Sequence, residues 1–205
     1  MILFKGNDSL SHTYLIERFD SCMLIDPSHD YELILKSIGE KTLKGILITH
    51  AHHDHIDLIG FFDVPIYIHK DDAHLLFEDR YNGYYPNKHP YKRKNLKLNL
   101  ISDEETIPLA DLEIKVIHTP GHTKGSVSYL FEKKLFTGDT LFKGSVGRHD
   151  LYSGNLSDLK KSIRKLMSLD GQMTVYPGHD QKTTIRNEKK LNPFVIKWEK
   201  QKNGR

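Results

Sequence analysis

The stretch Gly45-Ile46-Leu47-Ile48-Thr49-His50-Ala51-His52-His53-Asp54-His55 decides the fold of this chain. Its first part is a short apolar run, which predicts a buried strand, and this strand leads directly into the pattern His-X-His-X-Asp-His. On an extended or tightly turned loop, His50 and His52 point to one position, while Asp54 and His55 point to a second. Imidazole nitrogen and carboxylate oxygen are ligands that zinc and similar metals accept. The stretch therefore predicts metal binding, although a surface tract of histidines would also fit this segment taken alone.

The composition indicates one globular domain with an unusually high histidine content. The chain has 205 residues, of which 38% are hydrophobic and 28% charged, with 13 His and 1 Cys. These values argue against wholesale disorder and leave enough chain for a sizeable core. The single Cys22 excludes an intrachain disulfide and a zinc site built from cysteines, and its apolar strand favours a core position. The histidines are therefore the residues that need an explanation.

The ends of the chain and its net charge narrow the choice of partners. The N-terminal MILFKGNDSL lacks the apolar run of a signal peptide, and no segment approaches the roughly 18 apolar residues of a membrane span. We therefore expect a cytoplasmic protein without a membrane partner. A formal net charge of +3 gives only weak support for a nucleic-acid partner. The basic residues in 88–97 and from Lys189 to Arg205 are interpreted as a solvated face and a frayed tail.

Apolar patterns along the chain predict strands and helices without an internal repeat. Strands are expected at 14–16, 22–25, 45–48, 65–68, 112–117, 126–131, 134–137 and 173–176. Helices are expected at 31–38, at 71–79, from a cap near Asn155 or Ser157 to Met167, and at 183–191. The polar and aromatic segment 80–97 is expected to be a long loop, in which Tyr81, Tyr84, Tyr85 and residues 91–94 are candidates for a cleft wall.

Four of the predicted apolar strands end in His or Asp beside Gly, Pro or Thr. His50 follows the strand at 45–48, and His122, Asp139 and His179 follow three later strands. Strand ends are where a rigid sheet commonly positions binding side chains. These residues are therefore the candidates for completing a metal site begun by the histidine motif. The remaining eight histidines, including His53, are interpreted as surface or structural residues.

At this point the sequence resembles the metallo-β-lactamase-fold hydrolases over nearly its whole length. The motif 50–55, Gly121-His122, Gly138-Asp139 and Gly178-His179 occur in the order and rough spacing of that family. The segments 119–126 and 136–142 resemble the glyoxalase II (hydroxyacylglutathione hydrolase) branch, and 144–150 is similar to its compact members and to persulfide dioxygenases. The resemblance implies an α/β fold, a four-layer αββα sandwich with outer helices. It also implies one domain over 1–205 with similar halves at about 1–110 and 111–205.

The resemblance also implies a two-metal site. His50, His52 and His122 would hold the first ion, and Asp54, His55 and His179 the second, with Asp139 bridging. Two divalent ions are expected, zinc first, with iron or manganese accepted by the same ligands. Paired metals lower the pKa of a shared water towards about 7, so a metal-bridging hydroxide is the expected nucleophile, oriented by Asp54 and Asp139 as catalytic residues. The expected substrate is a small-molecule thioester or ester.

Arg148 is the expected substrate contact, because it follows the Asp139 strand and a guanidinium pairs well with a carboxylate. The competing interpretation is a surface salt bridge to Asp150. The chain after His179 is too short for the helical domain that supplies glutathione contacts in full-length glyoxalase II. The resemblance is therefore to a short form that lacks this C-terminal domain.

Two other functions are compatible with the same residues. An iron-dependent persulfide dioxygenase would need only His50, His122 and Asp139, and the complete second ligand set argues against it. A nucleic-acid-processing member of the fold would use the basic segments, but such enzymes carry an inserted domain for which this chain has no room. Metal content and substrate tests separate these alternatives.

Overall fold

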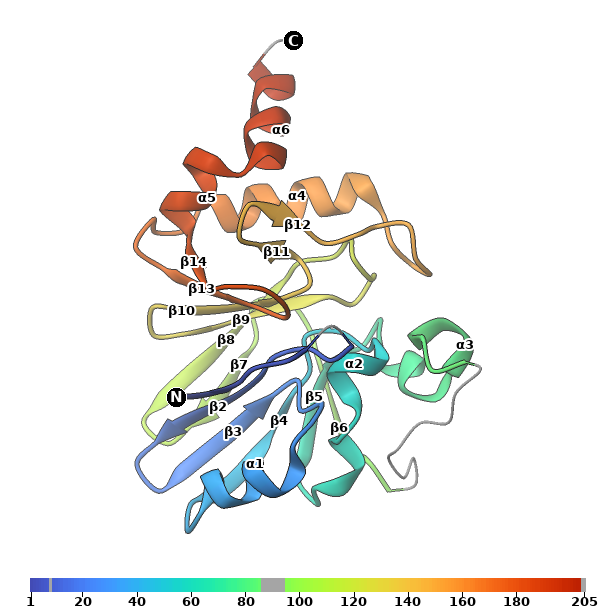
Figure 1. Ribbon diagram of the computed structural model, residues 1–205, viewed down its shortest axis with the longest axis vertical. Helices are drawn as coiled ribbons and strands as arrows, with labels where there is room; N and C mark the ends of the chain where they lie inside the picture. Colours follow the sequence, from blue (N-terminus) through green and yellow to red (C-terminus); the bar gives the residue numbers. More distant parts are fainter. Residues whose placement is uncertain (8, 86–94, 204–205) are drawn as a thin grey trace.

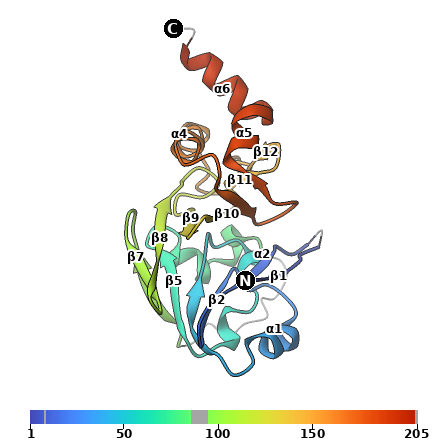
Figure 2. The same cartoon turned by 90° about the vertical axis from the view of Figure 1, so that its left-hand side faces the viewer.

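Two six-stranded sheets lie face to face in the computed structural model, which describes residues 1–7, 9–85 and 95–203. Helices cover the outer face of each sheet: α1 lies on one side, and α4, α5 and α6 lie on the other (Figure 1). Figure 2 shows the same layers after a 90° turn, with α1 and α6 at opposite ends of the molecule. The predicted α/β, four-layer αββα sandwich is confirmed.

The first sheet has the strand order β1-β2-β3-β4-β5-β6. Strands β1, β2 and β3 are antiparallel neighbours, whereas β3 to β6 run parallel. Its strands are β1 (Ile2–Phe4), β2 (Thr13–Arg18), β3 (Ser21–Ile25), β4 (Thr42–Leu47), β5 (Pro65–His69) and β6 (Lys97–Ile101). The helical segments in this part are α1 (Tyr31–Ile38), α2 (His53–Ile56), η1 (Ile59–Phe61), η2 (Ala73–Phe77) and α3 (Asp79–Asn82), η1 and η2 being 3₁₀ helices.

The second sheet has the order β14-β13-β10-β9-β8-β7, and its pair β10 and β13 is parallel. Helix α4 lies between these two strands in the sequence. The strands are β7 (Thr106–Leu109), β8 (Leu112–His118), β9 (Val127–Phe131), β10 (Lys134–Gly138), β13 (Thr174–Pro177) and β14 (Thr183–Thr184), with β11 (Leu141–Phe142) and β12 (Ser145–Val146) as a separate hairpin. The helices are α4 (Leu156–Met167), α5 (Ile185–Leu191) and α6 (Pro193–Asn203).

Three apolar layers hold the sandwich together. Side chains alternate along each strand, so Leu24 packs against α1 while its neighbour Met23 packs between the sheets. In the second sheet, Phe136 faces the inter-sheet core and Leu135 faces the helices α4 to α6. Burial on both faces explains why these strands are continuous apolar runs in the sequence.

The helix predicted to end at Met167 is confirmed as α4. The Asn155 side chain caps it by accepting a hydrogen bond from the Asp158 backbone N–H at 3.1 Å. Leu159, Ile163 and Leu166 form its buried face. A Cβ atom at Gly121 would lie only 2.3 Å from the Leu159 backbone, so α4 packs directly on the turn that precedes His122.

Several segments differ from the predictions. The helix predicted at 71–79 is replaced by η2 and α3, and the predicted loop 80–97 ends in β6. Its part from 86 to 94, with candidate wall residues 91–94, lies outside the described residues. The basic segment after Asn192 is the helix α6, not a frayed tail, because Val195 and Trp198 are buried against α4 and α5. Cys22 is buried in the core between the first sheet and α1, as predicted. Within the described residues, no helix combines the length and hydrophobicity needed to cross a membrane.

The helical layer gives a direct test of the packing. Leu166→Ala should lower the free energy of unfolding by about 2–5 kcal/mol, because it removes a fully buried side chain and leaves a cavity. The matched control is Leu191→Ala in α5, where the side chain is 73% exposed and the change should stay within about 0.5 kcal/mol. Urea unfolding of both variants measures the difference, and equal destabilisation would contradict this packing.

Candidate metal centre

All seven side chains predicted as metal ligands meet where strands of the two sheets end. His50 and His52 follow β4, and Asp54 and His55 lie in the short helix α2 directly after them. The other three come from the second sheet, in the loops after β8, β10 and β13. They are His122, Asp139 and His179.

Three imidazole nitrogens form the first group of ligand atoms. His50 Nε2 lies 3.0 Å from His52 Nδ1, His52 Nδ1 lies 2.9 Å from His122 Nε2, and His122 Nε2 lies 3.1 Å from His50 Nε2. Nitrogen ligands placed tetrahedrally at about 2 Å from zinc lie roughly 3.3 Å from one another. The three buried nitrogens are therefore close to the arrangement in which a single ion binds all of them.

A second group lies beside the first. Asp54 Oδ2 is 3.0 Å from His179 Nε2 and 3.6 Å from His55 Nε2. Asp139 lies between the groups, because its Oδ2 is 3.7 Å from both His122 Nε2 and His179 Nε2, and its Oδ1 is 3.4 Å from His55 Nε2. One carboxylate thus reaches both groups of ligand atoms.

Two buried atoms in this cluster lack hydrogen bonds to any part of the chain that the structure describes. They are His55 Nε2 and Asp139 Oδ1, which face each other without hydrogen-bond geometry. A buried polar atom without a partner is costly, so proteins rarely leave one unsatisfied. Both atoms are good metal ligands, and a cation between them would satisfy both. The donor set therefore fits divalent metal ions.

Electrostatics acts in opposite directions on His50 and His52 in the first group and on His55 in the second. Burial and the neighbouring imidazoles lower the pKa of His50 well below its usual value, and they lower the pKa of His52 to about 3. Burial also opposes the charged form of His55, but Asp54, Asp139 and Asp26 around it raise its pKa above the usual range. The three carboxylates around His55 therefore favour positive charge at this point, which a metal ion on His55 Nε2 would supply in place of a proton.

Asp26 orients two of the ligand histidines, and the sequence analysis did not identify it. His55 Nδ1 donates to Asp26 Oδ2 at 2.8 Å, which leaves His55 Nε2 free for the cluster. Thr49 Oγ1 also donates to Asp26 Oδ2, at 2.6 Å, and lies 3.2 Å from His50 Nδ1. A carboxylate behind a ligand histidine fixes its tautomer and raises its basicity. The available signal was an Asp at the end of a buried strand, directly before Pro27.

Two more contacts hold the loop that carries His122. Its Nδ1 donates to the Arg148 carbonyl at 2.8 Å, so its Nε2 points to the cluster. The buried Asp72 accepts from Thr123 Oγ1 at 2.6 Å and from the Ala51 N–H at 3.3 Å. Asp72 therefore ties the loop of His50 and His52 to the loop of His122. Thr49 and Thr123 thus contact the carboxylates behind the cluster, whereas the nearby Thr119 contacts Ser128 instead.

A cavity of about 340 Å³ opens over the ligand cluster. Its floor includes His52, Asp54, His122 and Asp139. Arg148 lies in the wall of this cavity. Its guanidinium forms two hydrogen bonds with Asp150, in agreement with the surface salt bridge that was the competing interpretation. The remaining wall residues come from α2, α3 and the loop after β12, and they are His53, Arg80, Tyr81, Asn82, Gly83, Leu151 and Tyr152.

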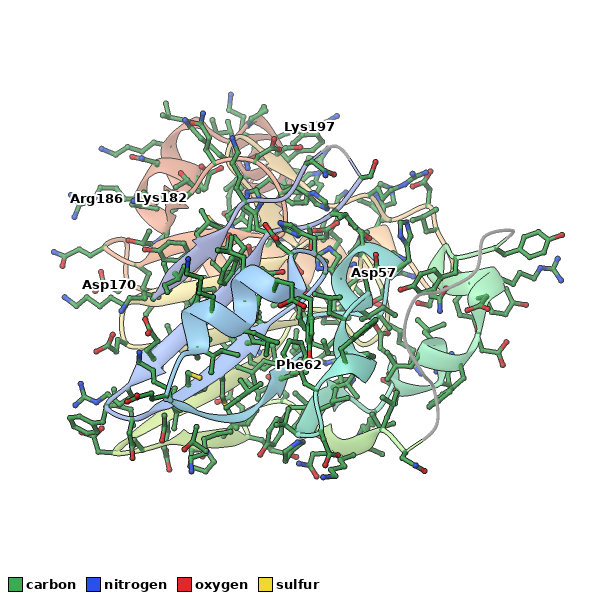
Figure 3. All side chains as sticks on the ribbon, turned by 60° about the horizontal axis from the view of Figure 1, so that its bottom comes forward. Asp57, Phe62, Asp170, Lys182, Arg186 and Lys197 are labelled. Carbon is green, nitrogen blue, oxygen red and sulfur yellow. The ribbon has the colours of Figure 1, made fainter. Side chains whose placement is uncertain are left out.

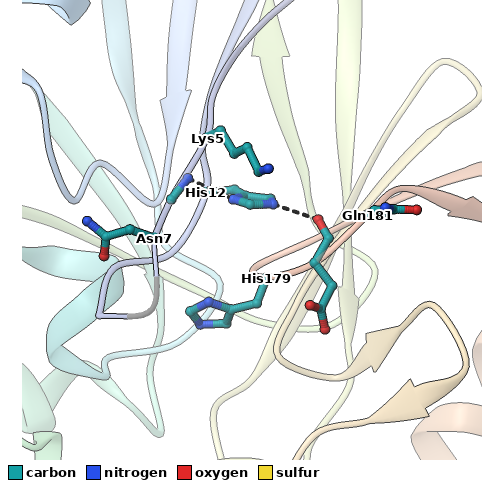
Figure 4. A pocket seen from close by; sticks show the side chains of 7 residues that line it. Lys5, Asn7, His12, His179 and Gln181 are labelled. Carbon is teal, nitrogen blue, oxygen red and sulfur yellow. Dashed lines mark hydrogen bonds between the residues drawn. The ribbon is translucent and has the colours of Figure 1, made fainter.

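A second cavity, of about 530 Å³, lies against another side of His179 (Figure 4). His12 forms part of its wall and links the N-terminal segment to the loop after β13. Its Nδ1 accepts from the Gly6 N–H at 2.9 Å, and its Nε2 donates to the Asp180 carbonyl at 2.7 Å. His12 is therefore structural, as predicted.

Of the other histidines predicted not to be ligands, His69 and His118 stack on each other with ring centroids 4.1 Å apart. With Asp71 they form a separate group of donor atoms. Their parallel rings point their in-plane lone pairs side by side, which is unsuitable for one shared ion. His89 lies outside the described residues.

Replacing Asp26 should weaken metal binding without removing a ligand. Asp26→Asn should lower metal affinity by about 10- to 100-fold, since the amide no longer provides the charge that orients His55. Metal titration followed by elemental analysis measures this loss. Asp170→Asn, on the surface far from α2 (Figure 3), is the matched control. Equal affinity of the two variants would show that Asp26 does not support the ligands.

Gly178 tests how tightly the cluster is packed. A Cβ atom there would lie 2.3 Å from Asp139 Oδ1 and 2.7 Å from His55 Cε1, so no larger residue fits without displacing a ligand. Gly178→Ala should reduce the metal bound per chain by at least about half. Gly171→Ala, whose Cβ would meet only ordinary contacts from 3.4 Å, should keep the wild-type metal content. Full metal loading of Gly178→Ala would contradict this geometry.

Comparison with known sequences gives relatives of similar length. The Bacillus subtilis protein named Probable metallo-hydrolase YqgX is 32% identical and covers 90% of this chain and 92% of its own length. Hydroxyacylglutathione hydrolase GloC of Haemophilus influenzae is 35% identical and covers 84% of this chain and 86% of its own.

Solved structures give the same fold. The B3 metallo-beta-lactamase BLEG-1 is 32% identical, with a TM-score of 0.86, and covers 95% of this chain and 98% of its own. A di-iron-bound form of TTHA1623 is 30% identical, with a TM-score of 0.82, and covers 95% and 100%. ETHE1 from Myxococcus xanthus is 29% identical, with a TM-score of 0.77, and covers 96% and 85%. The family model of the metallo-beta-lactamase superfamily matches residues 6–179, and the chain belongs to this superfamily.

Proposed function

We propose that this protein is a dinuclear metal-dependent hydrolase of small-molecule thioesters or related esters. His50, His52 and His122 would hold one ion, Asp54, His55 and His179 would hold the other, and Asp139 lies between the two groups. The observation that carries the proposal is the position of Asp139, whose carboxylate lies within 3.7 Å of nitrogens from both groups. Zinc is the proposed metal, and the likeness to the di-iron form of TTHA1623 makes iron the first alternative.

Two bound divalent ions would activate water as a nucleophile and polarise the scissile carbonyl. The protein's own part is to fix the ligands and to position the substrate. Thr49 and Asp26 hold the Nδ1 atoms of His50 and His55, so both Nε2 atoms remain free for the metals. Asp54 and Asp139 face the cavity, where their carboxylates would orient the attacking water by accepting hydrogen bonds from it.

The cavity supports hydrolysis by water instead of by a covalent enzyme intermediate. The described residues that line it include no serine, threonine or cysteine. Cys22 is buried in the outer core of the first sheet, and its pKa is raised to about 11 by burial. The choice of thioesters rests on the motifs at 119–126 and 136–142 and on the likeness to hydroxyacylglutathione hydrolase GloC. Arg148 is the proposed substrate contact, in competition with its bond to Asp150.

The second candidate is an iron-dependent dioxygenase that acts on persulfides. It is favoured by the likeness to ETHE1 from Myxococcus xanthus and by the presence of two histidines and one carboxylate with suitable positions. These are His50, His122 and Asp139, a set typical of non-haem iron oxygenases. The complete second group of ligands favours the hydrolase.

The deciding experiment uses protein loaded separately with zinc, manganese or iron. We expect thiol release from S-lactoylglutathione or another member of a thioester panel, and loss of this activity after chelation. Asp139→Asn should lower kcat at least about 100-fold, more than the 10- to 100-fold cost typical of an outer hydrogen-bond partner.

Asp170→Asn is the control and should keep wild-type activity. The hydrolase proposal would be wrong if protein with one iron per chain consumed oxygen with glutathione persulfide and hydrolysed no thioester. That result would support the dioxygenase.

A further inference from the structure

The cavity over the ligand cluster has two guanidinium groups in its wall, and their partners differ. Arg148 Nε and Nη2 donate to the two carboxylate oxygens of Asp150, at 2.9 and 3.0 Å. This bidentate pairing occupies the edge of the guanidinium that would otherwise bind a substrate carboxylate. A substrate anion would have to displace Asp150 before it could bind Arg148 in the same way.

Arg80 has no such partner. Within the described residues, its guanidinium forms neither an ion pair nor a hydrogen bond, and its Cζ lies 6.0 Å from the centroid of the Tyr81 ring. The side chain is exposed, yet it lines the same cavity as Asp54 and Asp139. Its charge and its hydrogen-bond donors are therefore available to a bound molecule.

The backbone of Arg80 is fixed relative to the ligand cluster, although it lies in the short helix α3. The buried Asn82 donates from Nδ2 to the Leu75 carbonyl at 2.7 Å. Tyr84 donates to the His53 carbonyl at 3.3 Å and also hydrogen-bonds to Asp57. A Cβ atom at Gly83 would lie 2.7 Å from His53 Cδ2, so the end of α3 sits directly on the metal-ligand motif.

A stacked pair of tyrosines joins α3 to the opposite wall. The rings of Tyr81 and Tyr152 lie 4.0 Å apart with planes 19° from parallel. This contact links the segment of Arg80 to the loop that follows Arg148, and it holds the two walls of the cavity at a set separation.

We propose that Arg80 is a specificity-determining residue that binds a carboxylate on the thiol part of the substrate. This inference rests on the proposed thioester hydrolysis. Asn82, Tyr84 and the tyrosine stack fix the backbone that carries Arg80, and its guanidinium offers a fork for an anion, whereas Arg148 must first release Asp150. An arginine fork matches a carboxylate with two parallel hydrogen bonds.

The test compares S-lactoylglutathione with its diethyl ester, in which both carboxylates are neutral. In Arg80→Gln, the ratio of kcat/KM for the acid to that for the ester should fall about 10- to 100-fold, as expected when a hydrogen bond to a charged group is lost. The decrease in kcat/KM for the acid should come from a higher KM, with kcat unchanged. Arg80→Lys should recover part of the ratio, and Arg148→Gln should change it less than Arg80→Gln.

Arg186→Gln is the matched control. Arg186 is exposed on α5, on the opposite side of the molecule from α3 (Figure 3), and its loss should leave the ratio unchanged. Metal content and thermal stability of each variant are measured in parallel. An unchanged ratio in Arg80→Gln, or a larger change in Arg148→Gln, would overturn the proposal.

The failure of the proposed reaction can be distinguished from the failure of this inference. If wild-type protein hydrolyses no thioester, the reaction is wrong, and calorimetric binding of glutathione and its diethyl ester to the metal-loaded protein still tests Arg80. Weaker binding of glutathione alone in Arg80→Gln would support the carboxylate contact. Equal binding of both compounds by wild type and Arg80→Gln would refute it.

Discussion

The structure depends on how the charge of several buried carboxylates is compensated where strands of the two sheets end. Asp54, Asp139 and Asp26 lie within contact of His55, and the neutral His50 and His52 lie beside them. Buried carboxylates need compensating positive charge or hydrogen-bond donors. The unsatisfied atoms of His55 and Asp139 mark where further positive charge fits.

The sandwich fold holds these side chains in position. Strands β4, β8, β10 and β13 are held by apolar layers on both faces, so their ends are rigid, and the loops after them are short. Asp26 and Asp72 then fix the loops at these strand ends. Each accepts hydrogen bonds from segments that carry side chains of the cluster. The glycines at 138 and 178 let the second sheet approach closely, since side chains there would collide with Thr49 and Asp139.

The clustering of the seven side chains could be predicted from the sequence because they are marked locally, by the histidine motif and by Gly-His or Gly-Asp at strand ends. The carboxylates behind the ligands could not be predicted, because Asp26 acts on a residue 29 positions away and Asp72 on one 51 positions away. Helix α6 was missed because lysines dilute its apolar positions, and only packing shows that Val195 and Trp198 are covered. Arg80 could not be singled out, since its place in the cavity depends on how α3 docks on His53.

The contacts around His179 join parts of the chain that are far apart in the sequence. His12 bonds to Asp180 across 168 residues, Tyr14 to Pro177 across 163, and Asp54 to His179 across 125. A growing chain therefore contains His50 and His52 long before the last ligand is made, and domains generally fold as units when their chain is available. The seven donor side chains can therefore come together only after His179 has been synthesised, so the cluster cannot form in the earlier part of the chain alone.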